Sequence, residues 1–113
     1  MRNESLEFLK RLVTTPSPSG FEEEVQEVCR HYAQPNADRI YKDVHGNQYA
    51  VKNPDASLRV MLAGHVDEIG LMVNTIDDKG FVSFLAVGGI DPAVLNGQRV
   101  AVHAGQADVE QRQ

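Results

Sequence analysis

Apolar side chains near the start of the chain recur every three or four residues. Two stripes follow one another: the first consists of Leu6, Leu9, Leu12 and Val13, and the second of Phe21, Val25, Val28, Cys29 and Tyr32. This spacing predicts amphipathic helices over about residues 4–14 and 20–33. Between them, the segment TTPSPSG contains two prolines and a glycine, which end the first helix. Ser19 followed by Glu22 is a capping-box pattern, so we expect Ser19 to cap the second helix and both helices to pack on a sheet.

Short apolar runs predict strands in the middle of the chain. Residues 38–44 and 48–53 flank HGN, which predicts a hairpin in which Gly46 or Asn47 takes a positive φ. The segment LRVMLAG, residues 58–64, is a nearly continuous apolar run, which is typical of a central strand covered on both faces.

A second hairpin is predicted around the polar turn DDKG. Residues 69–76 and 81–87 lie on either side of this turn, with Gly80 at its tight position. The segment GGIDPAVLNGQ follows as a loop with at most one helical turn. RVAVH, residues 99–103, predicts one more short strand.

Composition and charge narrow the class of protein. The chain has 113 residues, of which 42% are hydrophobic and 24% charged, and this suits one domain with a modest core. The net charge of −5 argues against nucleic acid or an anionic membrane as a partner. Cys29 is the single cysteine, which rules out an internal disulfide. With no signal-peptide pattern and no apolar run long enough to span a bilayer, we expect a cytoplasmic protein.

Three ionisable residues interrupt the apolar stretch MLAGHVDEIGLMV, residues 61–73. His65 follows the expected central strand directly, where α/β sheets place their ligands. In an extended chain residues two apart point to the same side, so His65 and Asp67 face one another. Such a pair suits a metal site, in which the imidazole binds the metal and the carboxylate fixes its orientation. Glu68 points elsewhere and receives no chemical role.

A hydrogen-bonded histidine at the end of a strand is the alternative interpretation of His65, because an H-x-D triplet is common by chance. Surface or hydrogen-bonding roles are expected for the other histidines, which are His31, His45 and His103. Cys29 lies in the apolar stripe of its helix and is predicted to be a small buried core residue rather than a nucleophile.

Four segments of the chain resemble, in order, the amino-terminal portion of the glutamyl-aminopeptidase or tetrahedral-aminopeptidase (cellulase M-like) family. These segments are TPSPSGFEEEVQEV, DVHGNQYAVK, VMLAGHVDEIGLMV and GFVSFLAVGGIDPAVLNGQRVAVH. The family consists of two-metal exopeptidases, some of them labelled cellulases or endoglucanases. The resemblance covers about residues 5–103, and the order of four segments makes it more specific than the H-x-D triplet alone.

The resemblance implies an α/β fold in two parts. Residues 1–72 would start a mixed-sheet metallopeptidase catalytic domain, and residues 73–103 would start an inserted β-barrel-like dimerisation domain. Residues 104–113 do not resemble the family and have little apolar content, so we expect a disordered tail. His65 matches the family's first metal-ligand histidine, and Asp67 matches the active-site aspartate that supports it. Two divalent ions, zinc or cobalt, would bind the amino terminus of a peptide substrate and activate a water molecule.

Most of the family's metal ligands and its general base have no counterpart in this sequence. Catalytic zinc takes about three protein ligands, whereas His65 has at most Asp67 beside it. The first hypothesis is therefore a truncated or fragmentary metallo-aminopeptidase that is inactive on its own. The second is a non-catalytic self-association module, a homo-oligomer, because open sheet edges pair readily with other chains. A third takes the cellulase label literally and uses Asp67 with Glu68, but neighbours on an extended chain point to opposite faces, whereas glycoside cleavage needs converging carboxylates.

Overall fold

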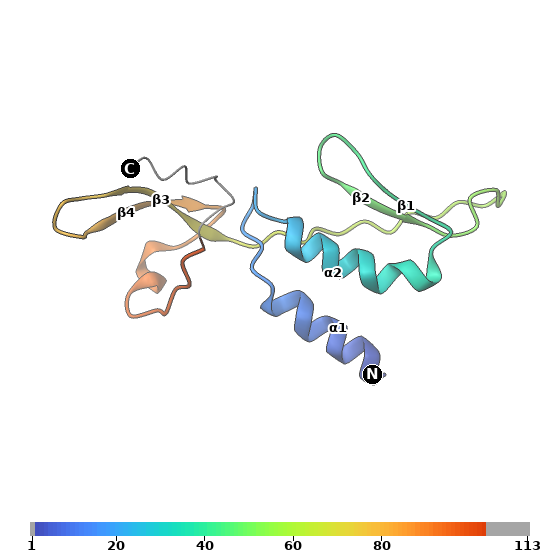
Figure 1. Ribbon diagram of the computed structural model, residues 1–113, viewed down its shortest axis with the longest axis horizontal. Helices are drawn as coiled ribbons and strands as arrows, with labels where there is room; N and C mark the ends of the chain where they lie inside the picture. The colour runs from blue at the N-terminus through green and yellow to red at the C-terminus, as the bar shows by residue number, and fades with distance from the viewer. Residues whose placement is uncertain (1, 104–113) are drawn as a thin grey trace, which may run out of the picture.

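The computed structural model describes residues 2–103 of the chain (Figure 1). Its elements, in chain order, are α1 (Asn3–Thr14), α2 (Glu23–Ala33), the 3₁₀ helix η1 (Gln34–Asn36), β1 (Arg39–Lys42), β2 (Gln48–Val51), β3 (Gly70–Ile76), β4 (Val82–Val87) and the 3₁₀ helix η2 (Pro92–Leu95). The expectation of a disordered tail over 104–113 lies outside the described residues. No helix within residues 2–103 has the length and apolar content that crossing a membrane requires.

The two predicted helices are confirmed, and they pack on each other. The ring of Phe8 in α1 stacks on that of Tyr32 in α2, with centroids 3.8 Å apart. The Ser5 hydroxyl lies 3.3 Å from the Tyr32 hydroxyl, so a polar contact continues the same interface. The helix α2 also contacts β2, whereas α1 packs on α2 rather than on a sheet. The expectation that both helices pack on a sheet therefore holds for α2 alone.

The start of α2 differs from the prediction. The helix begins at Glu23, and its N-cap residue is Glu22, whose side chain makes no capping hydrogen bond. Glutamates in the first turn favour this helix start because the helix dipole is positive there. Ser19 lies three residues before Glu22, outside the cap position, and its hydroxyl donates a hydrogen bond to Asp67.

The first predicted hairpin is confirmed as the antiparallel pair β1 and β2, with Arg39 opposite Val51 and Lys42 opposite Gln48. Gly46 takes the positive φ, at 88°, in the connecting turn. The side-chain amide of Gln26 donates to the Gly46 carbonyl over 2.8 Å, which ties the turn to α2. This hairpin and the helices therefore form one unit.

The second predicted hairpin is confirmed as β3 and β4, which pair antiparallel from Gly70–Val87 to Ile76–Val82. Gly80 has φ 84° at the tight position, as expected. Asp77 closes the turn, since its carboxylate accepts the backbone N–H groups of Lys79 and Phe81. This hairpin lies at the opposite end of the long axis from β1 and β2 (Figure 1).

Two predicted strands are wrong for the part of the chain that the structure describes. Residues 58–64 run extended but pair with no strand, and neither do residues 99–103. Met61 is 81% exposed and Leu62 is 93% exposed, so the apolar run is not covered on either face. A strand exists only through hydrogen bonds to a neighbour, and within residues 2–103 no segment forms ladder hydrogen bonds with 58–64. The observed sheets are accordingly two antiparallel hairpins and not one mixed sheet.

Burial is slight throughout the described chain. Val25 is the one apolar residue there that is fully buried, and Ser17 is the one buried polar residue, at 3% exposure. The radius of gyration is 18.4 Å, whereas a compact domain of this length has about 13 Å. The shape is elongated, with extents of 62 × 37 × 25 Å. The predicted single modest core is therefore not closed by residues 2–103.

Candidate metal site

A loop between the two helices meets the chain just before β3. This proline loop, residues 16–20, holds Pro16 and Pro18, whose rings fix φ and stiffen the backbone. The backbone N–H of Glu68 donates to the Ser17 carbonyl over 2.8 Å, and the Ser17 N–H donates to Glu68 Oε1 over 3.0 Å. Two reciprocal hydrogen bonds thus hold residues far apart in sequence side by side.

Gly70 allows this close approach. A Cβ atom at Gly70 would lie 2.7 Å from the Cβ of Pro18, a separation that real side chains do not tolerate. Because Gly70 has no side chain, β3 can begin directly against the proline loop. The contact places Asp67 within reach of the loop.

His65 and Asp67 face each other as the sequence predicts. The Nδ1 atom of His65 lies 2.9 Å from Asp67 Oδ1 and 3.1 Å from the Asp67 carbonyl oxygen. On its other side, Asp67 Oδ2 accepts the Ser19 hydroxyl over 2.5 Å. The carboxylate thus lies between a hydroxyl and an imidazole, with both oxygens engaged.

These contacts fix the charge of Asp67. The hydrogen bond from Ser19, and next the one from His65, hold the pKa of the Asp67 carboxyl below its ordinary value. The carboxyl is therefore ionised near neutral pH. An ionised carboxylate can only accept hydrogen bonds.

The protonation of the imidazole follows from the charge of Asp67. Because Asp67 can only accept, the Nδ1 atom of His65 carries the hydrogen. In the neutral ring the lone pair is then on Nε2, which is the atom that binds a metal. The His65 side chain is 86% exposed, so Nε2 is open to an incoming ion.

One oriented imidazole is less than a metal site. Catalytic zinc takes about three protein ligands. Within residues 2–103 no group of three or more histidine, cysteine or carboxylate side chains could hold an ion. The described residues therefore fit one corner of a metal site and do not fit a complete one, and we derive no catalytic step through a metal here.

Glu68, which received no chemical role from the sequence, has a structural one. Its carboxylate accepts the Ser17 N–H, while the carboxylate of Asp67 accepts the Ser19 hydroxyl. Both carboxylates are thus bound to the proline loop. This use gives no support to the glycoside-hydrolase hypothesis, which needs Asp67 and Glu68 free to converge on a sugar bond.

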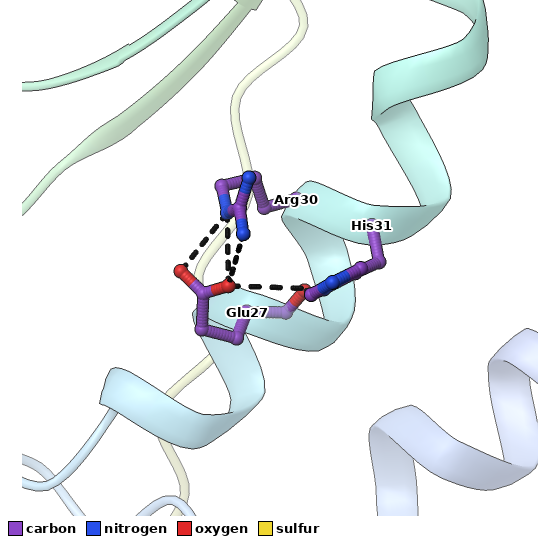
Figure 2. A network of polar contacts seen from close by, with 3 residues as sticks. All are labelled: Glu27, Arg30 and His31. Atoms are coloured by element: carbon purple, nitrogen blue, oxygen red, sulfur yellow. Dashed lines mark hydrogen bonds and ion pairs between the residues drawn. The ribbon is translucent and has the colours of Figure 1, made fainter.

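His31 has the surface hydrogen-bonding role that was expected of it. Figure 2 shows His31 beside Glu27, whose carbonyl oxygen accepts from its Nδ1 over 2.7 Å. Arg30 holds the Glu27 carboxylate through its Nε atom, at 2.9 Å from Oε2. The hydrogen bond from Arg30 lowers the pKa of Glu27, which therefore stays ionised as a surface acceptor.

Cys29 is half-buried rather than fully buried. Burial raises the pKa of its thiol, so the thiolate that a nucleophile needs is disfavoured. The prediction that Cys29 packs as a small apolar residue is consistent with this environment.

Ser19 is the residue of this site that sequence reasoning missed. The Ser19–Glu22 spacing points to a helix cap, in which the serine oxygen accepts a backbone N–H of the same helix, so the sequence suggests only a local role for this hydroxyl. The bond from Ser19 to Asp67 joins residues 48 positions apart in sequence. The SPSG sequence carries a local turn signal, but nothing in it specifies a partner so distant.

Fold and site together define the class of protein: an α/β chain that presents one carboxylate-oriented imidazole suited to a metal. The sequence profile of the M42 glutamyl aminopeptidase family matches residues 46–110, so the expectation that the resemblance ends at about residue 103 is wrong. This match covers more than half of the chain, and the chain belongs to that family. Members of the family are metal-dependent aminopeptidases.

Individual relatives agree with this assignment. The chain is 43% identical over 94 residues to a putative aminopeptidase of Acetivibrio thermocellus, covering 83% of this chain and 28% of the relative. It is 34% identical over 95 residues to a lysyl aminopeptidase of Pyrococcus furiosus, covering 83% of this chain and 27% of the relative. The crystal structure of a TET aminopeptidase from a marine sediment thaumarchaeon superposes with a TM-score of 0.72 at 36% identity, over 77% of this chain and 25% of that structure.

The chain thus spans between a quarter and a third of the length of these relatives.

Proposed function

We propose that this chain forms the amino-terminal part of a peptide-cleaving metallo-aminopeptidase, with His65 as a metal ligand and Asp67 as the active-site carboxylate that orients it. The contact between His65 Nδ1 and Asp67 Oδ1, at 2.9 Å, is the observation that carries this proposal. It leaves Nε2 exposed and available to an ion. The substrates are peptides with a free amino terminus, and the compartment is the cytoplasm.

The division of the chain follows the family resemblance. Residues 1–72 begin the catalytic domain, and residues 73–103 begin an inserted β-barrel-like domain. The two divalent ions, zinc or cobalt, require ligands beyond His65. The chain on its own therefore carries only part of the metal site and does not turn over substrate.

A zinc titration followed by NMR tests the role of His65. Nitrogen-15 signals of the His65 ring should shift at Nε2 when zinc is added, and the shift should be absent in His65→Ala. His45, which is exposed and whose ring makes no hydrogen bond among residues 2–103, is the internal control and should respond less, because no acceptor fixes the lone pair of its ring on Nε2. An equal response of both histidines would contradict a specific role for His65.

Hydrolysis of aminoacyl p-nitroanilides by the purified chain, with zinc or cobalt added, tests the claim that the site is partial. We expect no turnover. Metal-dependent turnover that disappears in His65→Ala would contradict the claim, because the missing ligands would then come from a second copy of the chain.

A second candidate function is self-association, and the exposed apolar segment at 58–62 favours it. Leu58, Val60 and Leu62 are 79%, 77% and 93% exposed, on backbone that pairs with no strand among residues 2–103. With α2 and the β1–β2 hairpin, this segment lines an open hollow of about 1760 Å³. An apolar unpaired strand is a site for pairing with another chain.

Sedimentation velocity over a wide concentration range tests self-association. Leu62→Lys should weaken association by about tenfold or more, because burying a leucine side chain contributes about 1.5–3 kcal/mol. Val13→Lys is the matched control, since Val13 is 68% exposed but lies in α1, which does not line this hollow. A monomer at every concentration would exclude this function.

A further inference from the structure

The Ser19 hydroxyl lies where it can control how Asp67 meets His65. It donates to Asp67 Oδ2 over 2.5 Å, while Oδ1 of the same carboxylate contacts His65 Nδ1 at 2.9 Å. A carboxylate held at both oxygens cannot rotate without breaking one of the two bonds. The hydroxyl therefore fixes the plane of the carboxylate, and with it the oxygen offered to the imidazole.

The position of Ser19 is itself fixed by contacts that its neighbours Ser17 and Pro18 make with residues distant in sequence. Ser17, two residues earlier, is 3% exposed and bonded to Glu68 through both its N–H and its carbonyl group. Pro18 lies against Gly70, where no side chain intervenes. The proline loop is thus anchored on Glu68 and Gly70, which lie one and three residues after Asp67, and Ser19 cannot move away independently of the site.

A role for the Ser19 hydroxyl in capping α2 does not compete with this one. The N-cap of α2 is Glu22, which lacks a side-chain capping bond. The N–H of Gly20 is taken by Glu22 Oε1 at 2.6 Å. The Ser19 hydroxyl therefore donates to Asp67 and does not cap the helix.

We propose that Ser19 is a positioning residue, whose hydroxyl holds Asp67 so that His65 keeps its hydrogen on Nδ1 and its lone pair on Nε2. The proposal rests on the role of His65 as a metal ligand given above, because Nε2 matters only if an ion binds there. Ser19 does not touch the ion or the substrate. It acts through Asp67, which sets the tautomer of the ring.

The tautomer of His65 in the metal-free chain is the quantity to measure. Two-bond proton–nitrogen correlations at about pH 8.5, well above the ordinary histidine pKa of about 6.5, distinguish Nδ1–H from Nε2–H rings. In the wild-type chain Nδ1–H should dominate. Ser19→Ala should lower the ratio of Nδ1–H to Nε2–H by roughly two- to tenfold, which corresponds to the net worth of one hydrogen bond.

Two isosteric variants separate the hydroxyl from the shape of the side chain. Ser19→Thr keeps a hydroxyl and should keep the wild-type ratio, whereas Ser19→Val has the same shape without it and should behave like Ser19→Ala. Ser57→Ala, at an exposed serine with no side-chain hydrogen bond among the described residues, is the unrelated control. Helix content by far-UV circular dichroism should be unchanged in all four variants.

Two results would overturn the proposal. One is a wild-type tautomer ratio in both Ser19→Ala and Ser19→Val. The other is loss of helix content in both variants, since the hydroxyl would then support the fold and not the orientation of Asp67. Failure of the proposed function looks different: zinc would leave the His65 ring unchanged in the wild-type chain, while the tautomer would still respond to Ser19.

Discussion

Aspartate side chains define the local geometry at several places in this chain. Asp43 accepts the backbone N–H groups of His45 and Asn47, at 3.0 and 2.9 Å. Asp91 accepts the N–H of Ala93 at the start of η2. Aspartate suits these positions because its short side chain reaches backbone groups two to four residues ahead. The same reach lets Asp67 contact the histidine two residues before it.

The β1–β2 turn should lose order in acid because of Asp43. The hydrogen bond from the Asn47 side chain is the main cause that lowers the pKa of Asp43 below its ordinary value. A lowered pKa in the folded state means that the ionised form stabilises the turn. Stability is then complete above the ordinary aspartate pKa of about 3.9 and is lost as the pH falls through the folded value.

Cross-strand nuclear Overhauser contacts between Tyr41 and Tyr49, whose rings stack with centroids 4.8 Å apart, measure this loss of order. They should weaken below about pH 4 in the wild-type chain. In Asp43→Asn the contacts should be weaker at neutral pH and independent of pH in this range. The same acid transition in both proteins would show that another group is responsible.

At the scale of elements, the contact of α1 with α2 depends on one aromatic pair. Phe8→Ala should lower the free energy of unfolding by about 1–3 kcal/mol, because it removes both the ring stack with Tyr32 and the apolar area that the stack covers. Val13→Ala is the control on the same helix, since Val13 is 68% exposed and its loss should change stability by less than about 0.5 kcal/mol. Urea titration followed by far-UV circular dichroism compares the two, and equal effects would contradict a specific role for the stack.

The junction of the proline loop with β3 depends on a missing side chain. Gly70→Ala should cost about 1–3 kcal/mol, because its Cβ would lie 2.7 Å from the Cβ of Pro18 and one of the two segments must move. The same substitution at Gly64, where a Cβ meets nothing within 4 Å, is the matched control.

Chemical shifts of Ser17 and Ser19 report on this junction. These shifts should change in Gly70→Ala and stay at their wild-type values in Gly64→Ala, because only the substitution at Gly70 displaces the proline loop from Asp67. Unchanged shifts in Gly70→Ala would mean that the loop and β3 tolerate the extra atom without separating.

At the scale of the whole molecule, the chain divides into two parts that share little packing. The helices and the β1–β2 hairpin contact one another, whereas the β3–β4 hairpin meets the rest mainly through the proline loop. Isolated two-stranded hairpins are marginally stable in water. The two parts should therefore unfold separately.

Residue-resolved amide signals in a urea titration measure the order of unfolding. Signals of Leu71 and Leu85, in β3 and β4, should disappear at lower urea than signals of Val28 in α2. Coincident transitions for all three residues would contradict this prediction, because they would show a single cooperative unit.

Local elements were predictable from the sequence because their causes are local. Helical spacing predicted both helices, and the glycines at 46 and 80 marked the two hairpin turns at which positive φ is observed. The H-x-D spacing predicted the contact of His65 with Asp67, because the alternation of an extended chain brings residues two apart together. The hypothesis that these two residues serve a metal remains a prediction.

Pairing over long distances was not predictable in this way. The run at 58–64 has the composition of a buried central strand, yet it is exposed, because burial depends on neighbours that composition does not supply. Ser19 has the spacing of a helix cap, but an aspartate 48 residues away takes its hydroxyl. The sequence by itself therefore determined both helices, both hairpin turns and the facing of His65 and Asp67, all set by backbone geometry over a few residues. The tertiary structure alone decided which segments pair, what is buried and how the proline loop holds Asp67, because those outcomes depend on close contacts between residues distant in the chain.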